Sequence, residues 1–201
     1  MPRGSRSLAA GTLMAITVAG CGAGPGVGIA GRQADGVLRP KLATSPRASA
    51  LPPGWNELRL PSGALLPYPP GWRPVSGDRG SASAALFDRD GTIRAYLNAT
   101  PVDGHEKLAG WACFRLRHNA AEGDRNVRRI TARTAIHRSA AGRTACVIDD
   151  YVTSRSRYRE LACILASTNG RAAVVVVAAA QPDAWTREQP LLDVAVNHFS
   201  S

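Results

Sequence analysis

Residue types that build metal sites are scarce in this sequence. Its 201 residues include four cysteines and four histidines, and no two cysteines have the Cys-x-x-Cys spacing of structural zinc sites. The histidines stand apart from one another along the chain, at His105, His118, His137 and His198. We therefore expect neither a metal site nor a cofactor.

Sequence signatures of hydrolytic catalysis are also missing. The chain lacks the Gly-x-Ser-x-Gly turn that presents a nucleophilic serine in many hydrolases. His118 with a serine and Asp149 or Asp150 gives the residue types of a triad, but nothing in their spacing brings them together. Asp149 and Asp150 are neighbours on an expected strand, so their carboxylates point to opposite faces, where we expect them to pair with arginines. The sequence favours a non-catalytic protein.

Apolar runs of membrane-spanning length are missing too. The longest apolar stretch, Leu8–Gly20, follows Arg3 and Arg6 and is shorter than the roughly 20 residues that cross a bilayer. It ends in Val18-Ala19-Gly20-Cys21, which resembles the lipobox of bacterial lipoproteins. We expect residues 1–20 to be a signal peptide, and a diacylglyceryl group on Cys21 to hold the chain to the outer face of the cell membrane.

Lysine is the scarce cation, although the chain is basic. The formal net charge is +10, and Lys41 and Lys107 are the two lysines among 25 cationic residues. This bias toward arginine favours the interpretation that the charge reflects arginine-rich coding in a high-GC genome. The alternative is a basic surface that meets anionic envelope components. An exported chain does not meet the usual nucleic-acid targets, so we expect no nucleic-acid partner. The expected partners are the membrane, through the lipid anchor, and anionic envelope components or another envelope protein.

Glycine and proline crowd the first third of the chain and then thin out. We expect residues 21–57 to be the lipidated cysteine and a flexible tether, and residues 58–201 to form one domain. A short repeat lies around the start of this domain: Pro52-Pro53-Gly54-Trp55 recurs as Pro69-Pro70-Gly71-Trp72. Each tryptophan is expected to cover an edge of the core.

Two hairpins and two helices are expected in the domain. Strands at 83–87 and 92–99 are joined by Asp88-Arg89-Asp90-Gly91, and strands at 143–153 and 158–166 by a turn near Ser154. Asp103 and Glu106 form a capping-box pattern that predicts a helix from 103 to 121. Further strands are expected at 127–133 and 171–179, and a last helix from Pro190. This order predicts an α+β fold, an antiparallel sheet packed by helices.

The order of elements resembles a known family. Tyr68-Pro69-Pro70-Gly71-Trp72, the long helix after the first strands, the following meander and the short last helix are similar to the PsbP/Mog-type domain over residues 58–200. Small exported actinobacterial-type lipoproteins carry such domains. The resemblance implies a binding or scaffold role and brings no catalytic residues.

Three cysteines remain after Cys21. Cys146 and Cys163 lie at matching distances from a two-residue turn at Ser154-Arg155, so a disulfide between them is favoured. Cys113 lies on the expected apolar face of the first helix. The alternative pairing joins it to one of the two sheet cysteines.

The function best supported by the sequence is that of a binding or scaffold module of the cell envelope. Its ligand or partner is expected in a groove between helix and sheet or on a basic face, formed by Trp72, Trp111, Arg115, His118, Arg128 and Arg129. One alternative is a carrier for a lipid or other apolar ligand, with Trp72 and Trp111 lining a cavity. A more remote alternative is an envelope hydrolase with His118 as its base.

Overall fold

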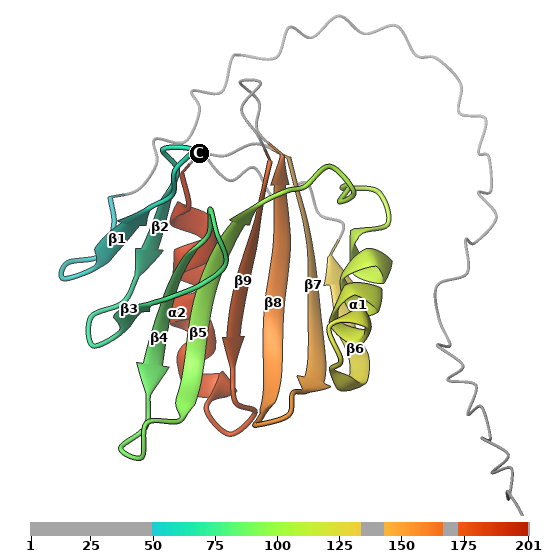
Figure 1. Cartoon of the computed structure of the whole chain (residues 1–201). Coiled ribbons are helices and arrows are strands. Elements are labelled where there is room, and N and C mark those ends of the chain that lie inside the picture. Colours follow the sequence, from blue (N-terminus) through green and yellow to red (C-terminus); the bar gives the residue numbers. More distant parts are fainter. Residues whose placement is uncertain (1–49, 134–142, 167–172, 201) are drawn as a thin grey trace, which may run out of the picture. The chain divides into compact units, whose positions relative to one another are not determined.

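The computed structural model describes residues 50–133, 143–166 and 173–200 (Figure 1). The expected signal peptide, Cys21 and most of the expected tether lie outside these residues. Within these ranges, no helix has both the length and the apolar character that crossing a membrane requires.

The described chain is built on a seven-stranded antiparallel sheet. Its strands follow the order β3 (Arg73–Val75), β4 (Ala82–Phe87), β5 (Ile93–Pro101), β9 (Val174–Ala180), β8 (Arg157–Ala166), β7 (Arg143–Val152), β6 (Arg125–Arg133). A separate hairpin of β1 (Asn56–Arg59) and β2 (Leu65–Tyr68) is joined to the chain's last residues by a bridge between Leu65 and Ser200. With its two helices, this sheet confirms the expected α+β class.

The two helices pack on opposite faces of the sheet. α1 (Trp111–Ala121) lies over β6 and β7 (Figure 1), and α2 (Trp185–His198) packs on the other face, against β9 and β8. Side chains alternate along β5: Leu97 belongs to the core beneath α2, while Tyr96 and Asn98 face the side of α1. α1 covers one end of this face of the sheet. On the same face, β4, β5 and β9 are therefore left open beside the helix.

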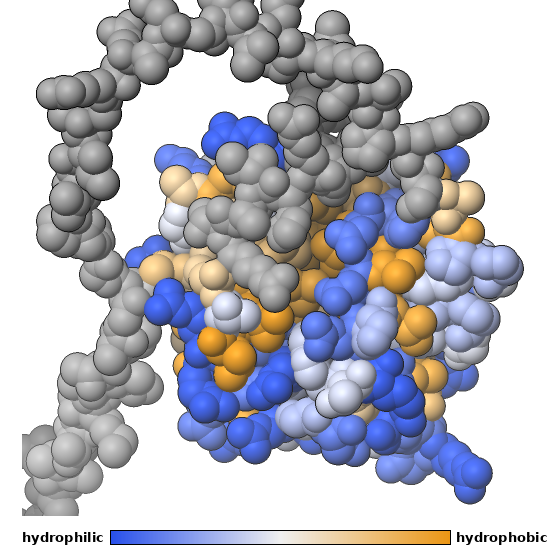
Figure 2. Space-filling view, turned by 180° about the vertical axis from the view of Figure 1, so that it is seen from behind, coloured by the Kyte–Doolittle hydropathy of each residue, from blue (hydrophilic) through white to orange (hydrophobic). Residues whose placement is uncertain are grey.

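The larger core cluster joins the sheet to α2. Trp185, Leu192 and Val196 lie on one side of α2 and are buried with Trp72 and Phe199. On the outside, hydrophilic and hydrophobic residues are mixed in the view from the α2 side (Figure 2). The core of the domain therefore lies mostly between α2 and the sheet.

α2 begins five residues earlier than the sequence predicts. Proline is typical of the first turn of a helix, which is why Pro190 was expected to begin this one. Instead Pro190 lies inside the helix, which starts at Trp185. Trp185 and Glu188 are buried, with exposed fractions of 7% and 3%, and their burial holds the first turn in place. The helix forms although Pro190 cannot donate a backbone hydrogen bond.

α1 begins eight residues later than the sequence predicts. The capping contacts do form: the Asp103 amide donates to Glu106 (3.1 Å), and the His105 amide donates to Asp103 (3.0 Å). They close a local turn, because Gly104 and Gly110 adopt φ of 100° and 77°, outside the helical region. The helix then starts at Trp111.

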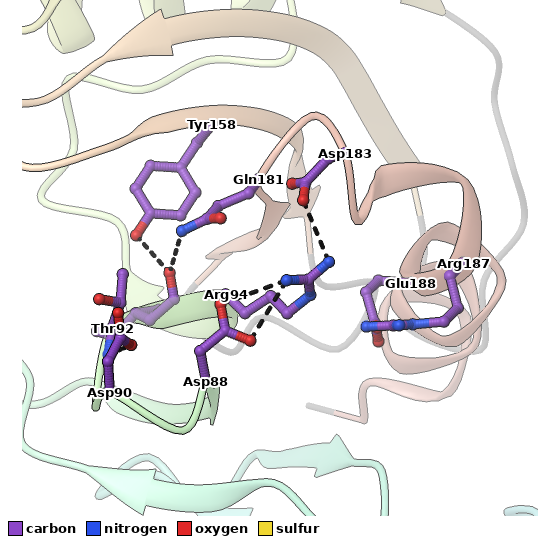
Figure 3. A network of polar contacts seen from close by, with 10 residues as sticks. Asp88, Asp90, Thr92, Arg94, Tyr158, Gln181, Asp183, Arg187 and Glu188 are labelled. Carbon is purple, nitrogen blue, oxygen red and sulfur yellow. Dashed lines mark hydrogen bonds and ion pairs between the residues drawn. The ribbon is translucent and has the colours of Figure 1, made fainter.

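The β4–β5 turn confirms the prediction of a hairpin. Asp90 accepts a hydrogen bond from the Thr92 amide (2.9 Å), and Gly91 has φ of 85°. Asp88 binds Arg94 at 3.3 Å, and Arg94 also reaches Asp183 at 3.3 Å, which ties the hairpin to the connection before α2 (Figure 3). Both aspartates thus serve the turn and its attachment.

The β7–β8 hairpin brings two cysteines together. The Thr153 amide donates to the Ser156 carbonyl (2.9 Å), so Ser154 and Arg155 form a two-residue turn. In this register Cys146 lies opposite Cys163, and the two form a disulfide with Cα atoms 4.2 Å apart. This is the favoured pairing, and Cys113 is therefore not joined to either sheet cysteine.

Candidate functional site

A groove of about 590 Å³ lies between α1 and the open part of the sheet. Its floor comes from Tyr96, Asn98 and Thr100 on β5 and from Val175 and Val177 on β9. The opposite wall is α1 with the loop that precedes it. Its volume lies within the range of small-ligand sites.

Three rings follow one another along the α1 wall. Trp111, Phe114 and His118 are spaced three and four residues apart, so they share one side of the helix. The ring centres of Trp111 and Phe114 are 5.8 Å apart, and those of Phe114 and His118 are 6.0 Å apart, with nearly parallel planes. The Trp111 indole donates to the Ala162 carbonyl (2.9 Å), which fixes the start of this aromatic row to β8.

Polar side chains on the floor are held in place by each other. The side-chain amide nitrogen of Asn98 donates to the Ser83 hydroxyl (2.8 Å), and the Thr100 hydroxyl donates to the side-chain oxygen of Asn98 (2.6 Å). These bonds fix the orientation of Asn98 before any ligand arrives. Such preorganisation lowers the entropic cost of binding.

A buried ion pair joins α1 to the sheet below the groove. Glu160 on β8 is fully buried and accepts two hydrogen bonds from Arg115, at 2.6 and 3.0 Å, and a third from Asn119 at 3.3 Å. Burial alone would lower the pKa of Arg115, but the adjacent Glu160 carboxylate holds that pKa above its usual value. Glu160 was not among the expected site residues, although an acidic residue within the largely apolar strand 158–166 was a signal in the sequence.

Asp149 corrects one expectation. It lies opposite Glu160 in the β7–β8 register and is fully buried, and neither carboxyl oxygen has a hydrogen-bond partner in the described structure. Burial, together with the Glu160 charge, raises the pKa of Asp149 to about 8. The expected pairing with an arginine is therefore wrong for Asp149. Arg115, the arginine whose charge acts on this carboxyl, is bound to Glu160.

The neighbouring Asp150 behaves as expected. It points to the other face, where Arg128 (2.8 Å) and Arg159 (2.7 Å) bind its carboxylate. The hydrogen bonds from Arg159 and Arg128 hold the pKa of Asp150 below its usual value. The two aspartates thus occupy different environments and do not form a catalytic pair.

Three tyrosines close the end of the groove near β7 and β8. The hydroxyl groups of Tyr96 and Tyr151 are hydrogen-bonded to each other, and burial raises the pKa of both. Tyr158 packs edge-on against Tyr96, at 5.5 Å between ring centres. Its hydroxyl and the side-chain amide of Gln181 both donate to the Ile93 carbonyl (Figure 3). These contacts make this end of the groove rigid.

The structure divides the expected ligand surface into three places. Trp111, Arg115 and His118 all line the groove. Arg128 and Arg129 lie on β6 at the sheet's far edge, where Arg128 is bound to Asp150. Trp72 is buried in the core beneath α2, on the other side of the sheet from Trp111. The expected cavity lined by both tryptophans is therefore wrong, since the sheet separates them.

The described residues around His118 do not form a catalytic triad. Its ring stacks on Phe114, and the structure gives it no hydrogen bond to a serine or a carboxylate of the described residues. Those residues also contain no group of three or more potential metal ligands. The chemistry that the groove offers is stacking, hydrogen bonding and charge.

Comparisons with known proteins bear on the fold. The cyanobacterial PsbP of Synechocystis sp. PCC 6803 is similar with a TM-score of 0.50 and 16% identity, over 79% of this chain and 97% of that chain. The Ran-binding protein Mog1p of Saccharomyces cerevisiae gives a TM-score of 0.50 and 12% identity, over 72% of this chain and 94% of that chain. The chain has the PsbP/Mog1 fold. The expected resemblance is thus confirmed for the architecture.

The PsbP/Mog1 likeness is one of structure alone. No protein-family model matches the chain, and no curated protein matches its sequence. A further similar structure is that of LpqN of Mycobacterium tuberculosis, with a TM-score of 0.42 and 13% identity, over 73% of this chain and 89% of that chain. At these identities no site residue is transferred, and the groove is characterised by its own side chains.

Proposed function

We propose that this protein is a non-catalytic binding module of the cell envelope, held by a lipid on Cys21, whose α1 groove receives a ligand or partner. The observation that carries the proposal is the groove itself. Its aromatic row and its fixed polar floor lie side by side and are left open by the described chain. Aromatic surface with a few oriented polar groups is the usual composition of a binding site.

Three further observations support this function. The Cys146–Cys163 disulfide is of the kind that persists in oxidising compartments outside the cytoplasm. Among the described residues, no nucleophile–base pair surrounds His118. One protein with this fold, Mog1p, is a Ran-binding protein, so the fold is able to serve protein recognition. An apolar-ligand carrier has less support, because the amide of Asn98 and the hydroxyl of Thr100 on the floor favour polar ligands.

A photoreactive amino acid placed at position 118 tests the groove in living cells. The His118 side chain is exposed on the groove wall and makes no side-chain hydrogen bond to another described residue that the substitution would break. We expect ultraviolet light to give a discrete adduct, detected by electrophoresis and mass spectrometry. The matched control places the same amino acid at Thr186, which is exposed on α2 on the opposite face. Equal adducts at both positions, or none at position 118, would contradict binding in the groove.

The lipid anchor is tested by Cys21→Ser. Removal of the thiol removes the site of lipid attachment, so we expect the variant to leave the membrane fraction or to remain unprocessed. Cell fractionation with the unaltered chain as reference measures this. A processed variant that stays in the membrane fraction like the parent would show that Cys21 is not the anchor.

A further inference from the structure

The groove is acidic although the chain is basic. Five carboxylates line it, and they come from three separate segments: Asp78, Asp103, Glu106, Glu122 and Asp124. Asp78 belongs to the β3–β4 connection, the next two precede α1, and the last two follow it. The chain as a whole carries a formal charge of +10. The negative charge is therefore concentrated locally, against the trend of the composition.

None of these five carboxylates is neutralised by the described chain. The ion pairs of the described residues involve other acids, and the one arginine that lines the groove, Arg115, is bound to Glu160. Asp103 and Glu106 accept backbone hydrogen bonds in their turn, which leaves their charge in place. Anionic ligands would meet repulsion here, and a cationic ligand would meet attraction.

The aromatic row lies between the two acidic ends. Trp111, Phe114 and His118 line the same wall, and the face of an aromatic ring attracts ammonium and guanidinium groups. α1 has 11 residues and is therefore about 16 Å long, so a single small cation does not reach the carboxylates at both ends. An extended chain of about five residues spans that length.

We propose that the groove binds a basic peptide segment of a partner protein, with its lysine or arginine side chains on the aromatic row and the surrounding carboxylates. This inference rests on the proposed function and adds the chemical class of the occupant. The arginine-rich remainder of the chain is then not the surface that recognises this partner. Attraction between the groove and its ligand weakens with salt, because the carboxylates at its mouth are solvated.

The test measures the affinity of the full mature chain for defined peptides. Three acetylated and amidated hexapeptides alternate alanine with arginine, glutamine or glutamate. We expect the arginine peptide to bind more tightly than the glutamine peptide by about tenfold at low salt and the glutamate peptide to bind weakest. Titration calorimetry gives the dissociation constants. Chemical shifts of α1 and β5 amides locate the bound peptide.

Two pairs of substitutions separate the groove from the rest of the surface. Asp78→Asn with Glu122→Gln removes two groove carboxylates whose side chains make no hydrogen bond or ion pair in the structure. We expect this variant to bind the arginine peptide about tenfold more weakly. Glu57→Gln with Asp183→Asn makes the same change in charge outside the groove. It releases Arg94 from Asp183 but leaves the ion pair of Arg94 with Asp88, and it should leave the affinity within about twofold.

Each contrary outcome has a distinct meaning. Equal affinity for the arginine and glutamine peptides in the groove would overturn this inference and leave the proposed function standing. Equal weakening by both pairs of substitutions would overturn it too, by showing a general electrostatic effect. If the arginine peptide does not bind, the inference fails, and the adduct at position 118 decides separately whether the groove is a binding site.

Discussion

Replacement of Arg115 by methionine should lower the free energy of unfolding by about 3–5 kcal/mol, the cost of leaving a buried charge without its partner. Glu160 is fully buried, and without the guanidinium it keeps a single hydrogen bond, from Asn119 at 3.3 Å. The pair also attaches α1 to the sheet, so the groove wall should loosen. Urea denaturation followed by tryptophan fluorescence measures the change.

Two variants make this prediction specific. Arg115→Met with Glu160→Leu removes both charges and should recover most of the lost stability, since an apolar pair of similar size is often neutral in place of a buried ion pair. Arg128→Met breaks an ion pair whose arginine side chain is 65% exposed and should cost less than about 1 kcal/mol. If Arg128→Met costs as much as Arg115→Met, burial of the pair is not the cause.

Asp149 should make the protein less stable as the pH rises from about 4 to about 8. Burial raises the pKa of this carboxyl to about 8, whereas an unfolded aspartate has a pKa of about 3.9. The folded chain therefore binds the proton more tightly. Its stabilising contribution is complete below about pH 4 and is lost at up to about 1.4 kcal/mol per pH unit until the folded carboxyl ionises.

Burial and the charges around Asp149 explain the direction. Burial is the main cause, the charges of Glu160, Asp150 and Asp124 add to it, and Arg115 opposes them but is bound to Glu160. Asp149→Asn should remove this part of the pH dependence, seen as a flatter plot of unfolding free energy against pH. Asp150→Asn is the control on the same strand. Because its pKa is lowered, Asp150 loses its own contribution as the pH falls. Its charge adds only a part of the shift at Asp149, so this variant should keep most of the slope between pH 5 and pH 8. An unchanged slope in Asp149→Asn would refute the assignment.

Local turn chemistry made the sheet predictable. The Asp90-Gly91 turn and the two-residue turn at Ser154-Arg155 fix the register of their hairpins, and the second register places Cys146 opposite Cys163. Both depend on residues within a few positions of the turn. The helix boundaries were less predictable, because the capping contacts of Asp103 form without a helix and because burial of Trp185 outweighs the proline within α2.

The groove depends on contacts between distant segments, which the sequence does not reveal. Trp111, Arg115 and His118 were identified together because they share one helix. Asp78 and Glu122 carry no local signal, and they meet at the groove because α1 covers one end of the sheet and leaves the other open. Alternation predicted that Asp149 and Asp150 point apart, but which of them would lack a partner depended on where the arginines of other elements lie.

Both edges of the sheet are unfavourable places for another strand to add. β3 is three residues long and contains Pro74, which has no amide hydrogen to donate. β6 departs twice from regular pairing, with Asn126 at φ of 54°, and its exposed Ile130 follows Arg128 and Arg129. Bulges and charges of this kind prevent edge-to-edge polymerisation. A lipid anchor would crowd copies of the chain into two dimensions, where protected edges let them remain separate and keep their grooves accessible.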